Sequence, residues 1–479
     1  MRRPFRTSLR PVESIESTTG LSLSTKEDFS SPAIGDQRMD KQPTISTITA
    51  FIKLTEADFE KQSEYAFSAF PVLGTKIDTV VTRLKELEHK FKEKGYNISS
   101  LRIATNPFCT WLLQNDNFVL AERLEFLDSL LQRHGIFGCS LGPAKNVSEL
   151  ACVRQIIAAS EKFHCFFTLD GKDFAGASKA IEVIYDISSL DPLGLANTRF
   201  CVAAKTCQPW NPFFPMAYYD EQIEEMETTI ASEHEVSTER ERNHHGLVVR
   251  FAIGLENGYL THHLLNMSGC IENIDTVFRQ GMIEALMPIQ QISENFCSIY
   301  TRNGRDDAKS MRKIKEIDNA FYGTMIHALF PPGLDLDYLA SSQSGMPLSK
   351  LPTPMRFMGI DTTIRFPFKT SSLVLTLECL KDIDEFGDCE TFVACTAIRN
   401  VLQSLDGIHS TGFCGISLPV CSDVRFIELI ESATSPRHLL NITSVCGNGV
   451  DMVCDLRFYK ILGVVLTVLI SMKKNRDSQ

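Results

Sequence analysis

The sequence of 479 residues lacks the short motifs that identify many nucleotide-binding proteins and hydrolases. It has no Walker loop, no G-x-S-x-G nucleophile elbow and no G-x-G-x-x-G after its first predicted strand. None of its 15 cysteines is spaced as C-x-x-C, and its paired histidines, His244-His245 and His262-His263, lack the spacing of metal ligands. No metal site is therefore predicted, and no single motif assigns a cofactor.

A basic surface and a long apolar run are also absent. The net charge of −11 argues against nucleic-acid binding, which needs cationic groups to replace the counterions of the phosphates. The late apolar stretch from Phe458 to Met472 contains Lys460 and is shorter than the ~20 residues of a membrane-spanning helix. We therefore expect residues 455–472 to pack on the protein as a helix and predict no membrane association. A membrane anchor is the alternative.

The cysteines and the N-terminus bear on where the protein resides. Most cysteines lie inside apolar runs, as Cys165 and Cys201 do, and a chain of this length does not need a disulfide framework. A reducing, cytoplasmic location is predicted. The N-terminus resembles a mitochondrial transit peptide only weakly, through its arginines and hydroxyl residues, so a mitochondrial location is the alternative.

A polar segment at the start of the chain is followed by a regular alternation of strands and helices. Residues 1–43 carry little hydrophobic periodicity and are predicted to be a disordered tail. Residues 44–479 are predicted to form a single domain with an acidic insertion at 220–243 and a long loop at 335–354. The predicted strands are 45–52, 98–105, 135–141, 165–170, 199–204, 246–256, 356–364, 412–420 and 439–447.

Strands that alternate with helices of this length indicate an α/β fold with mainly parallel strands. About nine strands in one uninterrupted pattern favour a closed or nearly closed barrel over two sheets, although periodicity does not distinguish the two. In parallel α/β folds, ligands bind at the carboxyl ends of the strands. Candidate site residues are therefore sought directly after each strand.

Two segments that follow strands could line a pocket. Asn106 comes directly after the strand 98–105. Asn211 and Tyr218 belong to a loop at 207–219 that is rich in proline and aromatic residues. Such a loop suits an apolar pocket with a few polar tips, or it merely covers the end of the barrel.

Two carboxylates and one arginine are the charged candidates. Glu256 ends the strand 246–256, and Asp361 lies inside the apolar strand 356–364, where an unpaired carboxylate would be costly. Arg102, inside the strand 98–105, is the available cation. Together Arg102 and Asp361 could hold a polar ligand, or each could simply neutralise the other.

The stretch Ser444 to Asp451, SVCGNGVD, places a thiol and a carboxylate around a glycine-rich turn. Gly447 and Gly449 permit positive φ, and the amides around Asn448 could form an anion-binding nest. Amide dipoles there could activate Cys446, and Asp451 could accept a proton or cap a helix. The alternative is a tight strand-to-helix turn with a buried thiol and a helix-capping aspartate.

Several of these stretches occur in the order found in one family. LRIATNPF, NPFFPMAYY, FAIGLENG, MGIDTTI, GFCGISLPVCSD and SVCGNGVD resemble the "domain of unknown function seven-eleven" family, labelled pyruvate-formate-lyase-like. The resemblance implies a ten-stranded α/β barrel like that of glycyl radical enzymes, with helices outside and a homodimeric assembly. The chain has no Arg-Val-x-Gly-Tyr loop for a glycyl radical and departs from the family after Asp451.

The sequence thus predicts an α/β barrel that binds a small anionic molecule at the strand ends. The catalytic candidates are Cys446, Asp361, Asp451 and Glu256. The ligand-binding candidates are Arg102, Asn106, Asn211, Tyr218, Gly447, Asn448 and Gly449. The alternative is a regulatory or scaffold protein without turnover, whose site is degenerate.

Overall fold

The computed structural model describes residues 42–61, 70–112, 117–169, 173–192, 194–204, 210–221, 248–301, 353–366, 372–419, 423, 425–426, 428 and 436–451. All of them belong to the unit Asp40–Gln479. The predicted helix at 455–472 lies outside the described residues. So do the N-terminal segment up to residue 41 and almost all of the predicted insertion at 220–243 and loop at 335–354.

Strands and helices alternate along the described chain. The strands are β1 (Thr44–Ile52), β2 (Leu101–Thr105), β3 (Gly138–Ala144), β4 (Phe163–Leu169), β5 (Phe200–Ala204), β6 (Val249–Glu256), β7 (Met355–Asp361), β8 (Ile416–Pro419) and β9 (Gly447–Asp451). The helices are α1 (Pro71–Glu93), α2 (Asn117–His134), α3 (Val147–Ala159), α4 (Phe174–Ser188), α7 (Gly258–Ser268), α8 (Arg279–Thr301), α11 (Leu373–Leu377), α12 (Cys389–Gln403) and α14 (Pro436–Cys446).

Helix α1 illustrates how the sequence dictates these elements. Pro71 occupies the start of the helix, where its missing N–H costs nothing. The buried side chains recur at helical spacing, and Gly95 follows the last turn with φ of +84°. The buried residues of α1 are Leu73, Ile77, Val80, Val81, Leu84, Leu87 and Phe91.

Seven strands form one sheet in the order β5-β4-β3-β2-β1-β6-β7, and β8 pairs with β9. Every neighbouring pair is parallel except β1 and β6, which are antiparallel. Two isolated parallel bridges lie between this sheet and β8: Ile360 of β7 bridges to Ser410 before β8, and Ile364 after β7 bridges to Ile416 of β8. The predicted α/β fold with mainly parallel strands is confirmed. Nine strands rather than ten are described, and closure into a barrel stays a prediction.

The antiparallel pair sets what lies at each edge of the sheet. Thr44, the first residue of β1, pairs with Glu256, the last residue of β6. The beginnings of β1–β5 therefore lie beside the ends of β6 and β7, at what we call the Arg102 edge. The ends of β1–β5 lie at the opposite edge, which we call the Asn106 edge. The expectation that the carboxyl ends of all strands meet at one edge is wrong, because β1 and β6 run in opposite directions.

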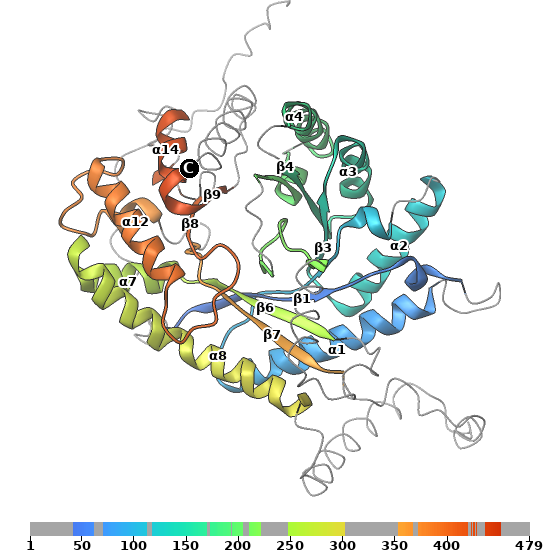
Figure 1. Ribbon diagram of the computed structural model, residues 1–479, viewed down its shortest axis with the longest axis horizontal. Helices are drawn as coiled ribbons and strands as arrows, with labels where there is room; N and C mark the ends of the chain where they lie inside the picture. Colours follow the sequence, from blue (N-terminus) through green and yellow to red (C-terminus); the bar gives the residue numbers. More distant parts are fainter. Residues whose placement is uncertain are drawn as a thin grey trace, which may run out of the picture. The chain divides into compact units, whose positions relative to one another are not determined.

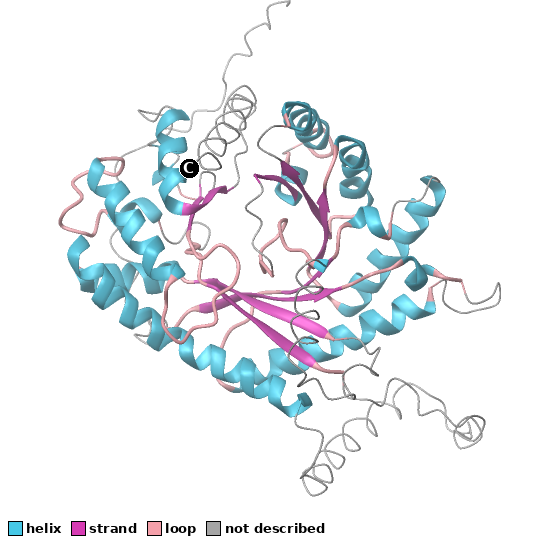
Figure 2. Cartoon of the chain, in the orientation of Figure 1, coloured by secondary structure: helices cyan, strands magenta, loops and turns pink. Residues whose placement is uncertain are grey.

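The sheet is covered differently on its two faces. The main apolar core lies between the sheet and the helices, with α1 and α8 on one side of β1, β6 and β7 (Figures 1 and 2). Residues 210–221, which we call the inner segment, lie on the opposite face of the sheet. A second cluster packs this segment against the sheet and consists of Phe51, Ala104, Trp210, Ala217, Tyr219, Ala252 and Met358.

The predicted strand at 439–447 is wrong. These residues belong to helix α14, and the strand β9 begins only at Gly447, whose φ is +82°. The glycine-rich stretch is therefore a helix-to-strand junction and not a strand-to-helix turn. The apolar run 439–442 is too short to separate the two periodicities, whereas the buried pair Ile442 and Cys446 follows the i, i+4 spacing of a helix.

Candidate functional site

Arg102 lies near the beginning of β2, with its guanidinium between two aromatic rings. Its Cζ atom is 4.8 Å from the ring centroid of Phe137 and 5.0 Å from that of Phe214. Its Nε donates a 3.0 Å hydrogen bond to Oγ of Ser100, which is the one partner that its guanidinium has among the described residues. Burial and the nearby positive charge of Arg365 lower the pKa of Arg102 to about 10, so it is still cationic at neutral pH.

Arg365 brings a second guanidinium to Phe213, the ring next to Phe214 in the sequence. Its Cζ atom lies 4.0 Å from the ring centroid of Phe213, the residue next to Phe214. Its backbone is fixed to the end of β6: the N–H of Arg365 donates to Oδ1 of Asn257, and its carbonyl accepts from the N–H of Gly258. Two cations from opposite halves of the sheet therefore rest on consecutive phenyl rings.

His164, on β4, adds a neutral imidazole. Its Nδ1 is 3.1 Å from the carbonyl oxygen of Lys162, and because a carbonyl only accepts, Nδ1 carries the proton. Burial lowers the pKa of His164 to about 3, opposed by the bond to Lys162 and reinforced by the charges of Arg102 and Arg199. The ring lies 4.7 Å from that of Phe214, so His164 and Arg102 flank the same phenyl group.

Gly138 makes room between Arg102 and His164. Gly138 on β3 is the register partner of Arg102 on β2. A Cβ atom on Gly138 would lie 2.8 Å from the carbonyl oxygen of Lys162 and 3.2 Å from Cε1 of His164. The glycine thus leaves the space on the middle strand that the imidazole occupies.

An open cavity of about 780 Å³ adjoins these residues. Phe137 and His164 line it, whereas Arg102 does not. Its charged lining residues are Lys162, Arg199, Asp128 and Glu161. Its volume is within the usual range for small-molecule sites. Phe137 is 54% exposed, which is unusual for a phenylalanine and leaves one of the two aromatic partners of Arg102 accessible.

The inner segment is fixed to the sheet by hydrogen bonds and by close packing. Oγ1 of Thr49 donates to the carbonyl of Pro212 at 2.7 Å, and Oγ of Ser140 donates to the carbonyl of Pro215 at 2.8 Å. A Cβ atom on Gly254 would lie 2.7 Å from the ring of Phe213, so only glycine allows this approach. The two phenyl groups beneath the cations are therefore held in place.

Asn211 and Tyr218, both predicted ligand-binding residues, lie on the inner segment. Oδ1 of Asn211 accepts from the N–H of Phe213 at 2.9 Å, whereas its buried Nδ2 has no partner among the described residues. The hydroxyl of Tyr218 donates to Oδ2 of Asp220, and its ring contacts Phe166. Because buried amides are normally hydrogen-bonded, the unpartnered Nδ2 of Asn211 is a stronger candidate for binding a ligand than the hydroxyl of Tyr218, which has a protein partner.

Asn106 follows the end of β2, at the edge of the sheet opposite Arg102. Its side-chain amide is hydrogen-bonded within the protein. Its Oδ1 accepts from the N–H of Leu54, and its Nδ2 lies within hydrogen-bond distance of the carbonyl of Leu54, Oγ1 of Thr110 and Oε1 of Glu221. These contacts connect the ends of β1 and β2. We infer a structural role for this side chain.

Asp361 is fully buried and surrounded by donors. Its carboxylate accepts from the N–H and the hydroxyl of Thr363 and from the N–H groups of Phe413 and Cys414. Burial raises the pKa of Asp361, and these hydrogen bonds oppose that shift. No ion pair joins Asp361 to Arg102 in the described part of the chain. Asp361 thus orders the loop before β8.

Glu256, the last residue of β6, is half-buried, and burial raises its pKa.

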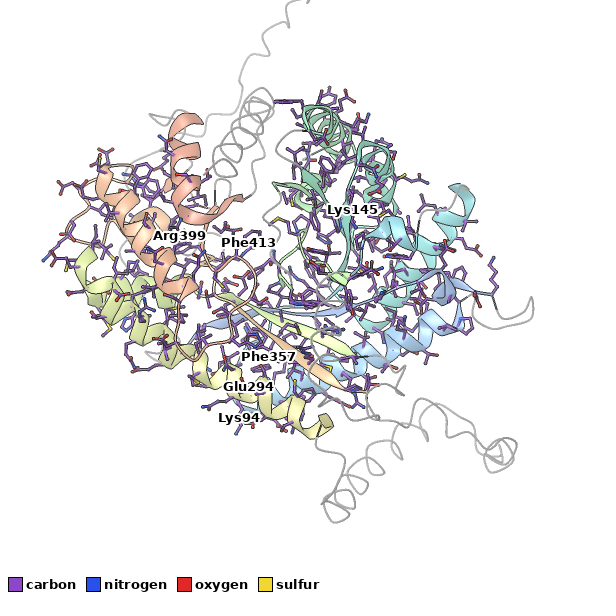
Figure 3. The ribbon with its side chains drawn as sticks, viewed as in Figure 1. Lys94, Lys145, Glu294, Phe357, Arg399 and Phe413 are labelled. Atoms are coloured by element: carbon purple, nitrogen blue, oxygen red, sulfur yellow. The ribbon has the colours of Figure 1, made fainter. Side chains whose placement is uncertain are left out.

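The thiol of Cys446 lies in the core between α14 and α12. It contacts Cys395, and this hydrogen bond together with burial raises the pKa of Cys446. Arg399, also on α12, is labelled in Figure 3, and its side chain would lie 2.9 Å from a Cβ atom on Gly447. The thiol is thus surrounded by the helix layer, whereas Arg102 contacts the inner segment. The structure does not bring these two residues together.

The remaining predicted site residues, Gly447, Asn448, Gly449 and Asp451, all lie in β9. Gly447 pairs with Ile416 and Gly449 with Ser417, in a ladder that ends at Pro419 and Asp451. The backbone from Gly447 to Asp451 is therefore paired with β8 along one side, with a register shift that leaves Asn448 without a partner in the ladder. The anion-binding nest around Asn448 stays a prediction. Asn448 is partly exposed.

Sequence reasoning missed His164, Arg365 and the aromatic residues beneath them. His164 is a polar residue in an otherwise apolar strand, the same signal that identified Asp361. The predicted strand began one residue after it, at 165. Arg365 follows the predicted strand 356–364 directly. Phe213 and Phe214 were within the segment that was predicted to line a pocket.

No helix among the described residues is long and apolar enough to cross a membrane. The described residues also contain no group of three or more histidine, cysteine, aspartate or glutamate side chains placed to hold a metal ion. The predicted homodimer, the cytoplasmic location and the lack of nucleic-acid binding stay predictions.

The chain is an α/β protein with a mostly parallel sheet, and Arg102, Arg365 and their aromatic neighbours form a cluster at the Arg102 edge. The family model described as "Uncharacterised ACR (DUF711)" matches residues 38–237 and 345–470. These ranges cover more than half of the chain and include Arg102, His164 and Arg365. The chain belongs to this family, as its motifs predicted. The comparison with curated proteins finds no match.

Proposed function

We propose that the protein binds a small anionic molecule at the Arg102 edge, with the guanidinium of Arg102 as the main binding group. The observation that carries the proposal is the environment of this cation. The guanidinium of Arg102 lies between the rings of Phe137 and Phe214. Among the described residues it donates a hydrogen bond only to Ser100. The nearby charge that affects its pKa is another cation, Arg365.

The energetics favour an anion at this place. Arg102 is partly buried. A cation loses part of its hydration in such a place, which is costly unless it is paired and hydrogen-bonded. The two phenyl rings offset part of that cost, since a cation over an aromatic ring gains roughly 0.5–2 kcal/mol. The terminal nitrogens form a planar fork that matches a carboxylate or a phosphate in a bidentate arrangement. A bound oxyanion would satisfy both the charge and the donors.

Some of the site residues predicted from the sequence are proposed to bind the ligand, and others are proposed to maintain the fold. We propose that Arg102 binds the ligand and that the free amide of Asn211 supplies a donor on the inner segment. Asn106 and Asp361 have protein partners for their polar atoms, and we infer that they maintain the fold. The site suits an enzyme or a sensor equally well, so the proposal concerns binding and assigns no reaction.

The proposal is tested by measuring ligand binding to matched arginine variants. Isothermal titration with acetate, succinate and inorganic phosphate is performed on the wild type, Arg102→Gln and Arg154→Gln. Arg154 is exposed on α3 and serves as the control. We expect at least one anion to bind to the wild type and to Arg154→Gln, with at least tenfold weaker binding to Arg102→Gln.

Two outcomes would contradict the proposal. One is equal affinity of the wild type and Arg102→Gln for the anion that binds. The other is the absence of binding for all three anions combined with no small molecule in native mass spectra of the purified protein. The second outcome would favour the alternative, a scaffold or regulatory protein with a degenerate site.

A further inference from the structure

His164 presents a hydrogen-bond acceptor beside the proposed anion site. Since its Nδ1–H is used by the carbonyl of Lys162, the lone pair of Nε2 is the acceptor that remains. His164 has no other hydrogen bond among the described residues. The ring also lines the cavity of about 780 Å³, so a small molecule in that cavity can reach it.

The acceptor and the cation are held on the same ring. The imidazole of His164 lies 4.7 Å from the ring centroid of Phe214, and the Cζ atom of Arg102 lies 5.0 Å from it. Gly138, on the strand between them, contributes no side chain that would separate the two groups. The imidazole centroid and the Cζ atom of Arg102 are therefore at most 9.7 Å apart (4.7 Å plus 5.0 Å), a span that one small ligand with a polar group at each end can bridge.

We propose that the ligand is a hydroxy acid, whose carboxylate binds Arg102 and whose hydroxyl donates a hydrogen bond to Nε2 of His164. This inference rests on the proposed anion site and specifies its ligand class. A site that combines a guanidinium fork with a neutral acceptor is complementary to an oxyanion that carries an O–H group. A simple carboxylate satisfies only the guanidinium and leaves the acceptor without a donor.

The chemistry of His164 supports an acceptor and not a second cation. Burial is the main factor that disfavours protonation of the ring, and the guanidinium groups of Arg102 and Arg199 act in the same direction. The imidazole therefore stays neutral at physiological pH, and the bond to Lys162 fixes which nitrogen carries its proton. Both features suit recognition of a neutral hydroxyl.

The test compares acids that differ only by a hydroxyl group. Isothermal titration is performed with glycolate against acetate and with malate against succinate. We expect the hydroxy acid of a pair to bind the wild type about fivefold more tightly, the effect of one net hydrogen bond. In His164→Phe this preference should vanish while the acid without a hydroxyl binds as before. Arg102→Gln should weaken both members of the pair.

A spectroscopic measurement tests the contact without relying on affinity. In protein labelled with ¹⁵N-histidine, the Nε2 resonance of His164 is identified by its loss in His164→Asn. Glycolate should move this resonance toward the position of a hydrogen-bonded nitrogen, and acetate should not. The two histidine variants together guard against misfolding of either one.

The outcomes separate this inference from the proposed function. Equal binding of the two acids in a pair, with dependence on Arg102 intact, would overturn the hydroxy acid assignment and leave the anion site standing. An unchanged Nε2 resonance at saturating glycolate would do the same. Failure of every acid to bind would overturn the hydroxy acid assignment. It would contradict the anion site as well only if inorganic phosphate also failed to bind and native mass spectra contained no small molecule.

Discussion

The carboxylate of Asp361 accepts a hydrogen bond from the backbone N–H of Cys414 at 3.2 Å, and this contact joins the end of β7 to the loop before β8. Phe413 and Thr363 donate to the same carboxylate. A glycine is needed at position 412, because a Cβ atom there would lie 2.2 Å from Oδ2 of Asp361. Cys414 itself has a φ of +47°, a conformation that the surrounding contacts must maintain.

We therefore expect Asp361→Ala to destabilise the fold. The substitution leaves buried N–H groups without an acceptor, each at a cost of roughly 1–3 kcal/mol, so the free energy of unfolding should fall by at least about 3 kcal/mol. Urea denaturation followed by circular dichroism measures this change. An unchanged unfolding midpoint, together with lost anion binding, would instead give Asp361 a role in the site.

Stability at acidic pH should depend on His164. Its pKa is lowered to about 3 in the folded protein, whereas an unfolded histidine titrates near 6.5. As the pH falls from about 6.5 toward 3, the unfolded chain takes up a proton that the folded protein does not. The free energy of unfolding should therefore fall by up to about 1.4 kcal/mol per pH unit in this window.

The pH dependence is measured by urea denaturation at several pH values between 4 and 7. His164→Asn should have a shallower slope over this window than the wild type, because it has no imidazole to protonate on unfolding. His89→Gln is the matched control, since His89 is exposed on α1. Equal slopes for the wild type and His164→Asn would contradict the burial of a neutral imidazole.

Gly447 and Gly95 provide a matched pair of substitutions. Both have positive φ, +82° and +84°, but a Cβ atom on Gly447 would also lie 2.9 Å from the side chain of Arg399, whereas Gly95 has open space around it. Gly95→Ala should cost about 1 kcal/mol through backbone strain alone. Gly447→Ala should cost more, by the amount needed to displace Arg399. Thermal unfolding of both variants compares these effects, and equal losses would show that Arg399 yields freely.

The thiol of Cys446 should be unreactive in the folded protein. It is fully buried, and its pKa is raised by the hydrogen bond with Cys395 and by burial, so little thiolate forms at neutral pH. Cys389, exposed at the start of α12, is the internal reference. Brief treatment with iodoacetamide and peptide mass spectrometry should find Cys389 modified and Cys446 unmodified. Rapid modification of Cys446 would indicate an accessible, activated thiol at this position.

The sequence predicted the local elements better than the long-range contacts. The helix α1 and most strands follow from hydrophobic periodicity and from Pro and Gly at their ends. The direction of β6 relative to β1 does not, because alternation is the same in parallel and antiparallel strands. That direction decides which residues share an edge, so Asn106 and Arg102 were expected at one site and lie at opposite edges.

The role of an isolated polar residue is equally hidden in the sequence. Asp361 and Arg102 both interrupt apolar strands, and nothing local distinguishes them. The structure separates them by partners: the carboxylate has four donors from its own chain, and the guanidinium has one acceptor among the described residues. Two of the four donors to Asp361, the N–H groups of Phe413 and Cys414, come from residues 52 and 53 positions away, and such partners cannot be identified from the neighbouring sequence.

The antiparallel contact between β1 and β6 also bears on the order in which the protein folds. The strands β1 to β5 pair with their neighbours in chain order, with roughly 40 residues between partners, whereas β6 must return to β1 across about 200 residues. Closing the longer loop costs about 1.4 kcal/mol more in chain entropy. We therefore expect β1–β5 to assemble first and β6–β7 to dock later. Arg365, which follows β7, comes near Arg102 only after that step, so the repulsion between these two cations would arise late in folding.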